Sequence, residues 1–117
     1  MTTILLIRHG ETDAIGNWIA GWSPGVHLNA AGREQAERLA GRLSRGPVAA
    51  IYSSPLERAR ETAGFLAARL GLPVRECDEF REVDFGQWTG RRLAELARDP
   101  HWRRFVELRA HSRAPGG

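Results

Sequence analysis

Residues 4–12 read Ile-Leu-Leu-Ile-Arg-His-Gly-Glu-Thr, and this stretch decides the fold class. Its four consecutive apolar residues, two of them β-branched, predict a fully buried strand over about residues 3–8. The apolar run stops at Arg8, His9 and Gly10, so that a guanidinium, an imidazole and a flexible residue would follow the strand. Ligands of open α/β sheets bind at the carboxyl ends of strands. A guanidinium suits anions with several oxygens, such as phosphate, and an imidazole can act as a nucleophile or a base. The alternative is an ordinary strand end with solvated polar residues.

The next part of the chain alternates helices with short strands. The apolar spacing predicts helices at about 29–44 and 55–70. Asn29 is the expected N-cap of the first, and Ser54 is the expected N-cap of the second, in a capping box with Glu57. Short apolar strands are expected at about 48–52 and 73–76, and two further helices at about 90–98 and 100–110. This order predicts a single domain over residues 1–117 with a mostly parallel α/β sheet.

The predicted topology leaves the first strand in an exposed position. Right-handed crossovers place the three strands in the order 3-2-1, with the strand at 3–8 on an edge. That strand is the most hydrophobic segment of the chain, and long apolar edges invite aggregation. We therefore expect that at least one further strand is missing and that the chain is truncated at its C-terminus. A homodimer whose partner covers the edge is the alternative.

Composition excludes several classes of function. The 117 residues carry a net charge of only +3, and the basic residues alternate with acids. This pattern is typical of a solvated helix face rather than a nucleic-acid site. The single cysteine, Cys77, excludes an internal disulfide, and no Cys or His spacing indicates a metal. The first residues do not combine a basic segment with a long apolar one, so we expect no signal peptide, no membrane-spanning segment, no membrane partner and a cytoplasmic location.

Two residues later in the chain extend the predicted site. Arg58 lies in the first turn of the second helix, where the helix dipole disfavours a cation, and it would point toward Arg8 and His9. Glu82 follows the third strand at the same edge of the sheet and could donate a proton to a leaving oxygen. The nearby acids Glu79 and Asp84 compete for this role on spacing alone.

Smaller residues of the first loop complete the predicted site. Gly10 would let the chain pass close to an anion, and Thr12 and Asn17 could donate hydrogen bonds to it. The loop at about 9–29 is long for a compact domain, which is typical of a functional segment. Trp22, within this loop, or Trp88, later in the chain, could form a wall of a pocket.

Four ordered motifs resemble those of the histidine phosphatase superfamily, the phosphoglycerate mutase-like group. They are Leu-Ile-Arg-His-Gly-Glu-Thr at 6–12, Leu-Asn-Ala-Ala-Gly-Arg-Glu-Gln-Ala at 28–36, Ser-Ser-Pro-Leu-Glu-Arg-Ala-Arg-Glu-Thr-Ala at 53–63, and Arg-Glu-Val-Asp-Phe-Gly-Gln-Trp-Thr-Gly at 81–90. The resemblance implies a three-layer α/β/α fold. The sequence departs from the family pattern in two places. No later strand supplies the second histidine that the family usually has. Ile15 stands where an asparagine is common, and Asn17 follows two residues later.

The resemblance also implies a function. His9 would become phosphohistidine, Arg8 and Arg58 would bind the phosphoryl oxygens, and Glu82 would donate and accept the proton, with no metal or organic cofactor. The expected activity is hydrolysis of small phosphomonoesters. The alternatives are a cofactor-dependent phosphoglycerate mutase and a non-catalytic remnant that binds phosphate esters.

Overall fold

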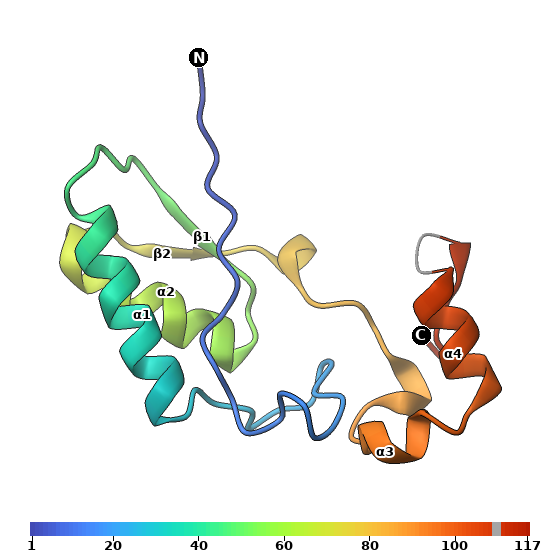
Figure 1. Cartoon of the computed structure of the whole chain (residues 1–117). Coiled ribbons are helices and arrows are strands. Elements are labelled where there is room, and N and C mark those ends of the chain that lie inside the picture. The colour runs from blue at the N-terminus through green and yellow to red at the C-terminus, as the bar shows by residue number, and fades with distance from the viewer. Residues whose placement is uncertain (109–110) are drawn as a thin grey trace.

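The computed structural model describes residues 1–108 and 111–117. Helices α1 (Ala30–Leu43) and α2 (Glu57–Leu70) pack side by side, and α2 also lies against strands β1 (Ile51–Ser53) and β2 (Val74–Glu76) (Figure 1). The two strands are parallel neighbours, with Ile51 opposite Val74. This confirms the parallel α/β arrangement predicted for this part of the chain. A core of four buried side chains holds these elements together: Ala40, Ile51, Ala63 and Leu66.

The two long helices begin differently from each other. The side chain of Asn29 accepts a hydrogen bond from the Gly32 N–H, which confirms the predicted N-cap of α1. The predicted cap of α2 at Ser54 is wrong, because the helix begins at Glu57, two residues after the predicted start at position 55. The Ser54 hydroxyl accepts instead from the N–H of Leu56, whose extended backbone delays the helix. A short side chain that bonds its own local backbone competes with helix formation in this way.

The predicted buried strand at 3–8 is wrong. Residues 1–10 have no regular secondary structure, and the apolar side chains are exposed, Leu6 by 94%. In Figure 1 this segment, in dark blue, extends away from the helices toward the free N-terminus. The reason is the absence of a pairing partner, because the described residues place no strand beside it and its apolar side chains have nothing to pack against.

The last third of the chain forms a second unit around aromatic side chains. It contains two single-turn helices, η1 (Asp78–Phe80) and η2 (Gly86–Trp88), followed by α3 (Leu93–Leu96) and α4 (Pro100–Glu107). Its core consists of Trp88, Leu96, Phe105 and Ala114, and the rings of Trp88 and Phe105 meet edge to face at 5.2 Å. Helices α3 and α4 are both shorter than predicted. Positions 109–110 of the predicted last helix lie outside the described residues.

The two units make an open molecule. The radius of gyration is 16.0 Å, whereas a compact domain of this length measures about 13 Å. The accessible surface is 8262 Å², whereas a compact monomer of this size exposes about 6,300 Å². No helix in the described ranges is long and apolar enough to cross a membrane.

Candidate active site

His9 stands where the exposed N-terminal segment enters the fold. Its Nδ1 lies 2.7 Å from the Gly10 carbonyl oxygen, so that Nδ1–H donates and Nε2 keeps its lone pair. Burial lowers the pKa of His9 below its usual value. The hydrogen bond to Gly10 opposes this shift, and the positive charges of Arg58 and Arg8 add to it. A neutral imidazole with an unprotonated Nε2 is the form that a nucleophile requires.

Arg58 projects from the first turn of α2 toward His9. Its Nε donates to His9 Nε2 at 3.2 Å, and its Nη2 donates to the Gly21 carbonyl oxygen at 3.0 Å. The residue is only 3% exposed, and its Nη1 has no hydrogen-bond partner among the described residues. None of the ion pairs in the described ranges involves Arg58, and burial lowers the pKa of its guanidinium. The site therefore contains a buried cation with an unused donor beside the His9 imidazole.

The backbone at Gly10 and Glu11 is clamped between α1 and α2. The Gly10 N–H donates to the hydroxyl of Thr62, which itself donates to the Arg58 carbonyl oxygen one turn earlier in α2. On the other side, Gly32 of α1 approaches so closely that a Cβ there would lie 2.1 Å from the Glu11 carbonyl oxygen. Both helices therefore fix the position of His9.

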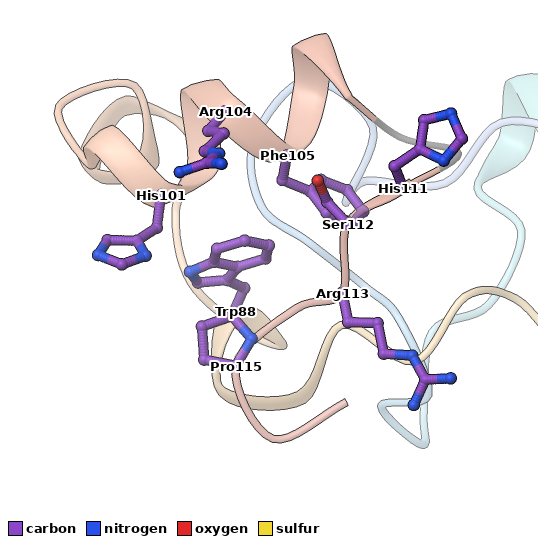
Figure 2. A pocket seen from close by; sticks show the side chains of 8 residues that line it. All are labelled: Trp88, His101, Arg104, Phe105, His111, Ser112, Arg113 and Pro115. Atoms are coloured by element: carbon purple, nitrogen blue, oxygen red, sulfur yellow. The ribbon is translucent and has the colours of Figure 1, made fainter.

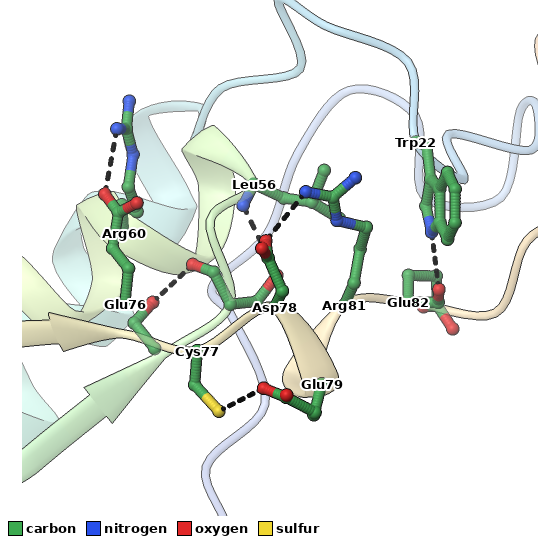
Figure 3. A network of polar contacts seen from close by, with 11 residues as sticks. Trp22, Leu56, Arg60, Glu76, Cys77, Asp78, Glu79, Arg81 and Glu82 are labelled. Carbon is green, nitrogen blue, oxygen red and sulfur yellow. Dashed lines mark hydrogen bonds and ion pairs between the residues drawn. The ribbon is translucent and has the colours of Figure 1, made fainter.

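Glu82 lies in the loop between η1 and η2, in an exposed position. Its negative charge raises the pKa of both His9 and Arg58, which places its carboxylate within electrostatic reach of them. The competing acids are engaged elsewhere: Glu79 bonds the Cys77 thiol, and Asp84 accepts from the Gly86 N–H. Figure 3 shows Glu79 beside Cys77 and Glu82 farther along the chain, beside Trp22. Glu82 also accepts locally, from the Val83 N–H, but among the three acids it is the one whose charge acts on both His9 and Arg58.

The remaining predicted residues divide into two groups. Arg8 is exposed and acts on His9 through its charge alone among the described contacts. Thr12 is buried, and Asn17 is exposed and donates its side-chain amide to the Asp13 carbonyl oxygen. Within the described ranges, neither Thr12 nor Asn17 hydrogen-bonds His9 or Arg58. The structure thus brings His9, Gly10 and Arg58 together and leaves Asn17 in a local turn.

Several residues at the site were not predicted as part of it. Nothing in the sequence marks Thr62 as a site residue except its position one helical turn after Arg58. The sequence suggests that Glu57 and Glu61 are acids on a helix surface. Their carboxylates instead accept hydrogen bonds from the long loop, Glu57 from the Gly25 N–H and Glu61 from the Leu28 N–H. Only the helical spacing of 57, 58 and 61 could have indicated that these three residues face the same loop.

A cavity of about 310 Å³ lies elsewhere, between α4 and the C-terminal segment. Four basic side chains line it: His101, Arg104, His111 and Arg113. Figure 2 shows that the groups of His111 and Arg113 point away from Trp88, so these basic groups do not converge. The cavity belongs to the aromatic unit and not to the site at His9. In the part of the chain that the structure describes, no cluster of three or more His, Cys, Asp or Glu could hold a metal ion.

The family model of the histidine phosphatase superfamily (branch 1) matches residues 4–117. The bifunctional protein Rv2228c of Mycobacterium tuberculosis is 41% identical over 99% of this chain, which covers 32% of that protein. The mycobacterial glucosyl-3-phosphoglycerate phosphatase Rv2419c superposes with a TM-score of 0.83 at 35% identity, covering 93% of this chain and 52% of that one. It has also been solved in complex with inorganic phosphate.

A putative α-ribazole-5′-phosphate phosphatase from Escherichia coli K-12 gives a TM-score of 0.82 at 32% identity, over 95% of this chain and 56% of that one. The chain therefore spans between about a third and just over half of the length of these relatives. Because the family model covers almost every residue and the solved relatives share the fold, the chain belongs to the histidine phosphatase superfamily.

Proposed function

We propose that this chain carries the nucleophile and the phosphate-binding group of a phosphomonoesterase that works through a phosphohistidine at His9. The single observation that carries the proposal is the unpartnered Nη1 of Arg58, in a side chain 3% exposed and hydrogen-bonded to His9 Nε2. A buried donor without an acceptor costs about 1–3 kcal/mol, and more when it is charged. A phosphoryl oxygen would supply both the missing acceptor and the missing counter-charge.

The proposed reaction has two steps. His9 Nε2 attacks phosphorus while the ester P–O bond breaks, and Glu82 gives a proton to the departing alcohol oxygen. Glu82 then takes a proton from water, which attacks the phosphohistidine, and the Nε2–P bond breaks to release inorganic phosphate. Arg58, with Arg8, stabilises the charge on the phosphoryl oxygens in both steps. The names of the relatives support small phosphorylated metabolites as substrates. Gly10, Thr12 and Asn17 remain proposed contacts of the phosphate.

We also propose that full activity requires a further strand beside residues 3–8, from the remainder of the same domain or from a second copy. The exposed side chains of Ile4, Leu5 and Leu6, and about 2,000 Å² of surface beyond that of a compact monomer, support this. The domain of 1–117 would then be incomplete. A non-catalytic phosphate binder is the alternative that this observation favours, and a cytoplasmic location remains a prediction.

Phosphate binding by the chain tests the proposal without requiring turnover. Isothermal titration with inorganic phosphate should show binding that Arg58→Gln weakens about 10-fold or more, since a hydrogen bond to a charged group contributes about 1.5–3 kcal/mol. Arg60→Gln is the matched control, because Arg60 is in the same helix and pairs with Glu76 at the surface (Figure 3). Equal affinity of the two variants would refute the role of Arg58.

Turnover then separates the enzyme from the binder. Incubation with a panel of phosphate esters should release phosphate and leave a phosphohistidine that His9→Ala abolishes. Conversion of 3-phosphoglycerate to its isomer would indicate a mutase instead. Binding of phosphate without release from any ester would support the non-catalytic alternative.

A further inference from the structure

Gly21 and Trp22, consecutive residues of the long loop, contact the proposed phosphate-binding residue Arg58 and the proposed proton donor Glu82. The Gly21 carbonyl oxygen accepts from Arg58 Nη2 at 3.0 Å, and the indole Nε1 of Trp22 donates to the Glu82 carbonyl oxygen at 2.6 Å. Figure 3 shows the Trp22 indole aligned with Glu82. A phosphate-binding residue and a proton donor are therefore tied to adjacent positions of one segment.

The segment that carries Gly21 and Trp22 is itself held onto α2. The carboxylate of Glu57 accepts from the Gly25 N–H, and that of Glu61 accepts from the Leu28 N–H and contacts His27. The Gly25 N–H bond lowers the pKa of Glu57. Burial raises the pKa of Glu61, but the bonds from His27 and Leu28 outweigh this and leave it lowered. Both carboxylates are thus stabilised in the ionised form that these bonds need.

Glu82 has few other restraints. It lies between two single-turn helices, and its own Oε1 accepts from the neighbouring Val83 N–H. The preceding Arg81 is held by Asp78 and places its guanidinium 4.9 Å from the centre of the Trp22 ring. Trp22 therefore contacts the loop twice, through its N–H and through its ring face.

Gly21 is packed on the segment that follows Glu82. A Cβ at Gly21 would lie 3.0 Å from Thr89 Oγ1 and 3.5 Å from a ring carbon of Phe85, and its φ is +49°. Any other residue would push the loop away from 85–89 and strain the backbone. The close approach explains why the loop can contact Arg58 and Glu82 at the same time.

We propose that Trp22 is a positioning residue for Glu82, and that the Gly21–Trp22 dipeptide sets the separation between the phosphate-binding Arg58 and the proton donor. The inference rests on the roles proposed above for Arg58 and Glu82. Trp22 acts through the Glu82 backbone: its N–H fixes the carbonyl, and the fixed backbone directs the carboxylate toward the leaving oxygen.

The test compares Trp22→Phe with Trp18→Phe. Phenylalanine keeps an aromatic face for Arg81 but removes the N–H donor, and Trp18 is the matched control in the same loop with a similar exposure, 36% against 42%. Two substrates are used: p-nitrophenyl phosphate, whose leaving group needs little protonation, and glycerol phosphate, whose alkoxide leaving group needs a proton. General acid catalysis contributes about 10²–10⁴-fold.

Trp22→Phe should lower kcat for glycerol phosphate by about 10-fold or more and for p-nitrophenyl phosphate by less than about 3-fold, with KM little changed. Trp18→Phe should change neither substrate selectively. Equal losses on both esters in Trp22→Phe would overturn the inference, because a merely structural effect on the site does not distinguish leaving groups.

Amide hydrogen exchange tests the same contact independently of turnover. Residues 81–85 should exchange faster in Trp22→Phe than in the unmodified chain, and at an unchanged rate in Trp18→Phe. Unchanged exchange in Trp22→Phe would overturn the positioning role. Should the unmodified chain hydrolyse neither ester, the proposed function fails for the isolated chain, and the exchange experiment still decides whether Trp22 holds the Glu82 loop.

Discussion

Gly32 lies in the first turn of α1 against the backbone of Gly10 and Glu11, and its replacement by alanine tests how α1 positions His9. In most helices, replacing glycine by alanine stabilises the protein, by about 1 kcal/mol at an interior position. At Gly32 the added methyl would lie 2.1 Å from the Glu11 carbonyl oxygen and 2.7 Å from the Glu11 nitrogen. We expect the sign of the effect to reverse.

The size of the effect follows from what must move. An ordinary contact of a Cβ begins near 3.4 Å, so the backbone at 10–11 has to retreat from α1 by more than one ångström. That movement would break the two bonds that join Glu11 to α1, from the Glu11 N–H to Gln35 and from the Asn29 N–H to the Glu11 carbonyl oxygen, each worth about 1 kcal/mol. Overpacking adds about 1–3 kcal/mol. After the helix-propensity gain is subtracted, Gly32→Ala should destabilise the fold by about 2–4 kcal/mol.

Urea unfolding followed by far-ultraviolet circular dichroism measures this difference. Gly64→Ala is the matched control, because Gly64 is in the middle of α2 and a Cβ there meets nothing within 4 Å. That variant should be stabilised by about 0.5–1 kcal/mol. Where turnover is measurable, Gly32→Ala should also lower it about 100-fold, because a displacement of this size misplaces a nucleophile. Equal stabilisation of both variants would refute the proposed clamp on His9.

Three further predictions concern other parts of the fold. Burial and the charges of Arg58 and Arg8 lower the pKa of His9, so an NMR titration of the folded chain should give a midpoint below about 6.5. As the pH falls, the imidazole is protonated in the unfolded chain before it is protonated in the folded one, so the free energy of unfolding should decrease through this pH range. Asn29→Ala removes the N-cap of α1 and should cost about 1 kcal/mol in urea unfolding; an unchanged midpoint would show that the cap is dispensable. Leu6→Gln should change the stability of the isolated chain by less than about 0.5 kcal/mol, since Leu6 is 94% exposed, whereas a large loss would show that another chain covers it in solution.

The residues at the centre of the site were predictable because they break local rules. A cation in the first turn of a helix and an imidazole after an apolar run have no structural purpose of their own, and the structure places Arg58 Nε 3.2 Å from His9 Nε2. The N-cap at Asn29 was predictable because a cap depends on three neighbouring residues. Local chemistry thus determines the parts that sequence reasoning finds.

The parts that could not be predicted depend on distant partners. The apolar run at 3–8 has the composition of a buried strand, but burial needs a neighbouring strand, and none is present in the described residues. The capping box at Ser54 has the right residue types, but Glu57 bonds the Gly25 N–H, 32 positions away, instead of its own helix. The roles proposed for Gly21 and Trp22 likewise rest on bonds to residues more than thirty positions away.

These long-range bonds explain why one loop can control the site. The core around Ile51 and the core around Trp88 are separate clusters in the described residues. The long loop joins them: residues 17–19 exchange backbone hydrogen bonds with 90–93, and residues 25–28 bond α2. Arg58 is on α2, which contributes to the first core, and Glu82 precedes the residues of the second core in the chain. Since Gly21 and Trp22 lie between the loop's two attachments, a change in either attachment would alter the separation of Arg58 and Glu82. The proposed chemistry therefore depends on acids such as Glu57 and Glu61, which need never touch the substrate.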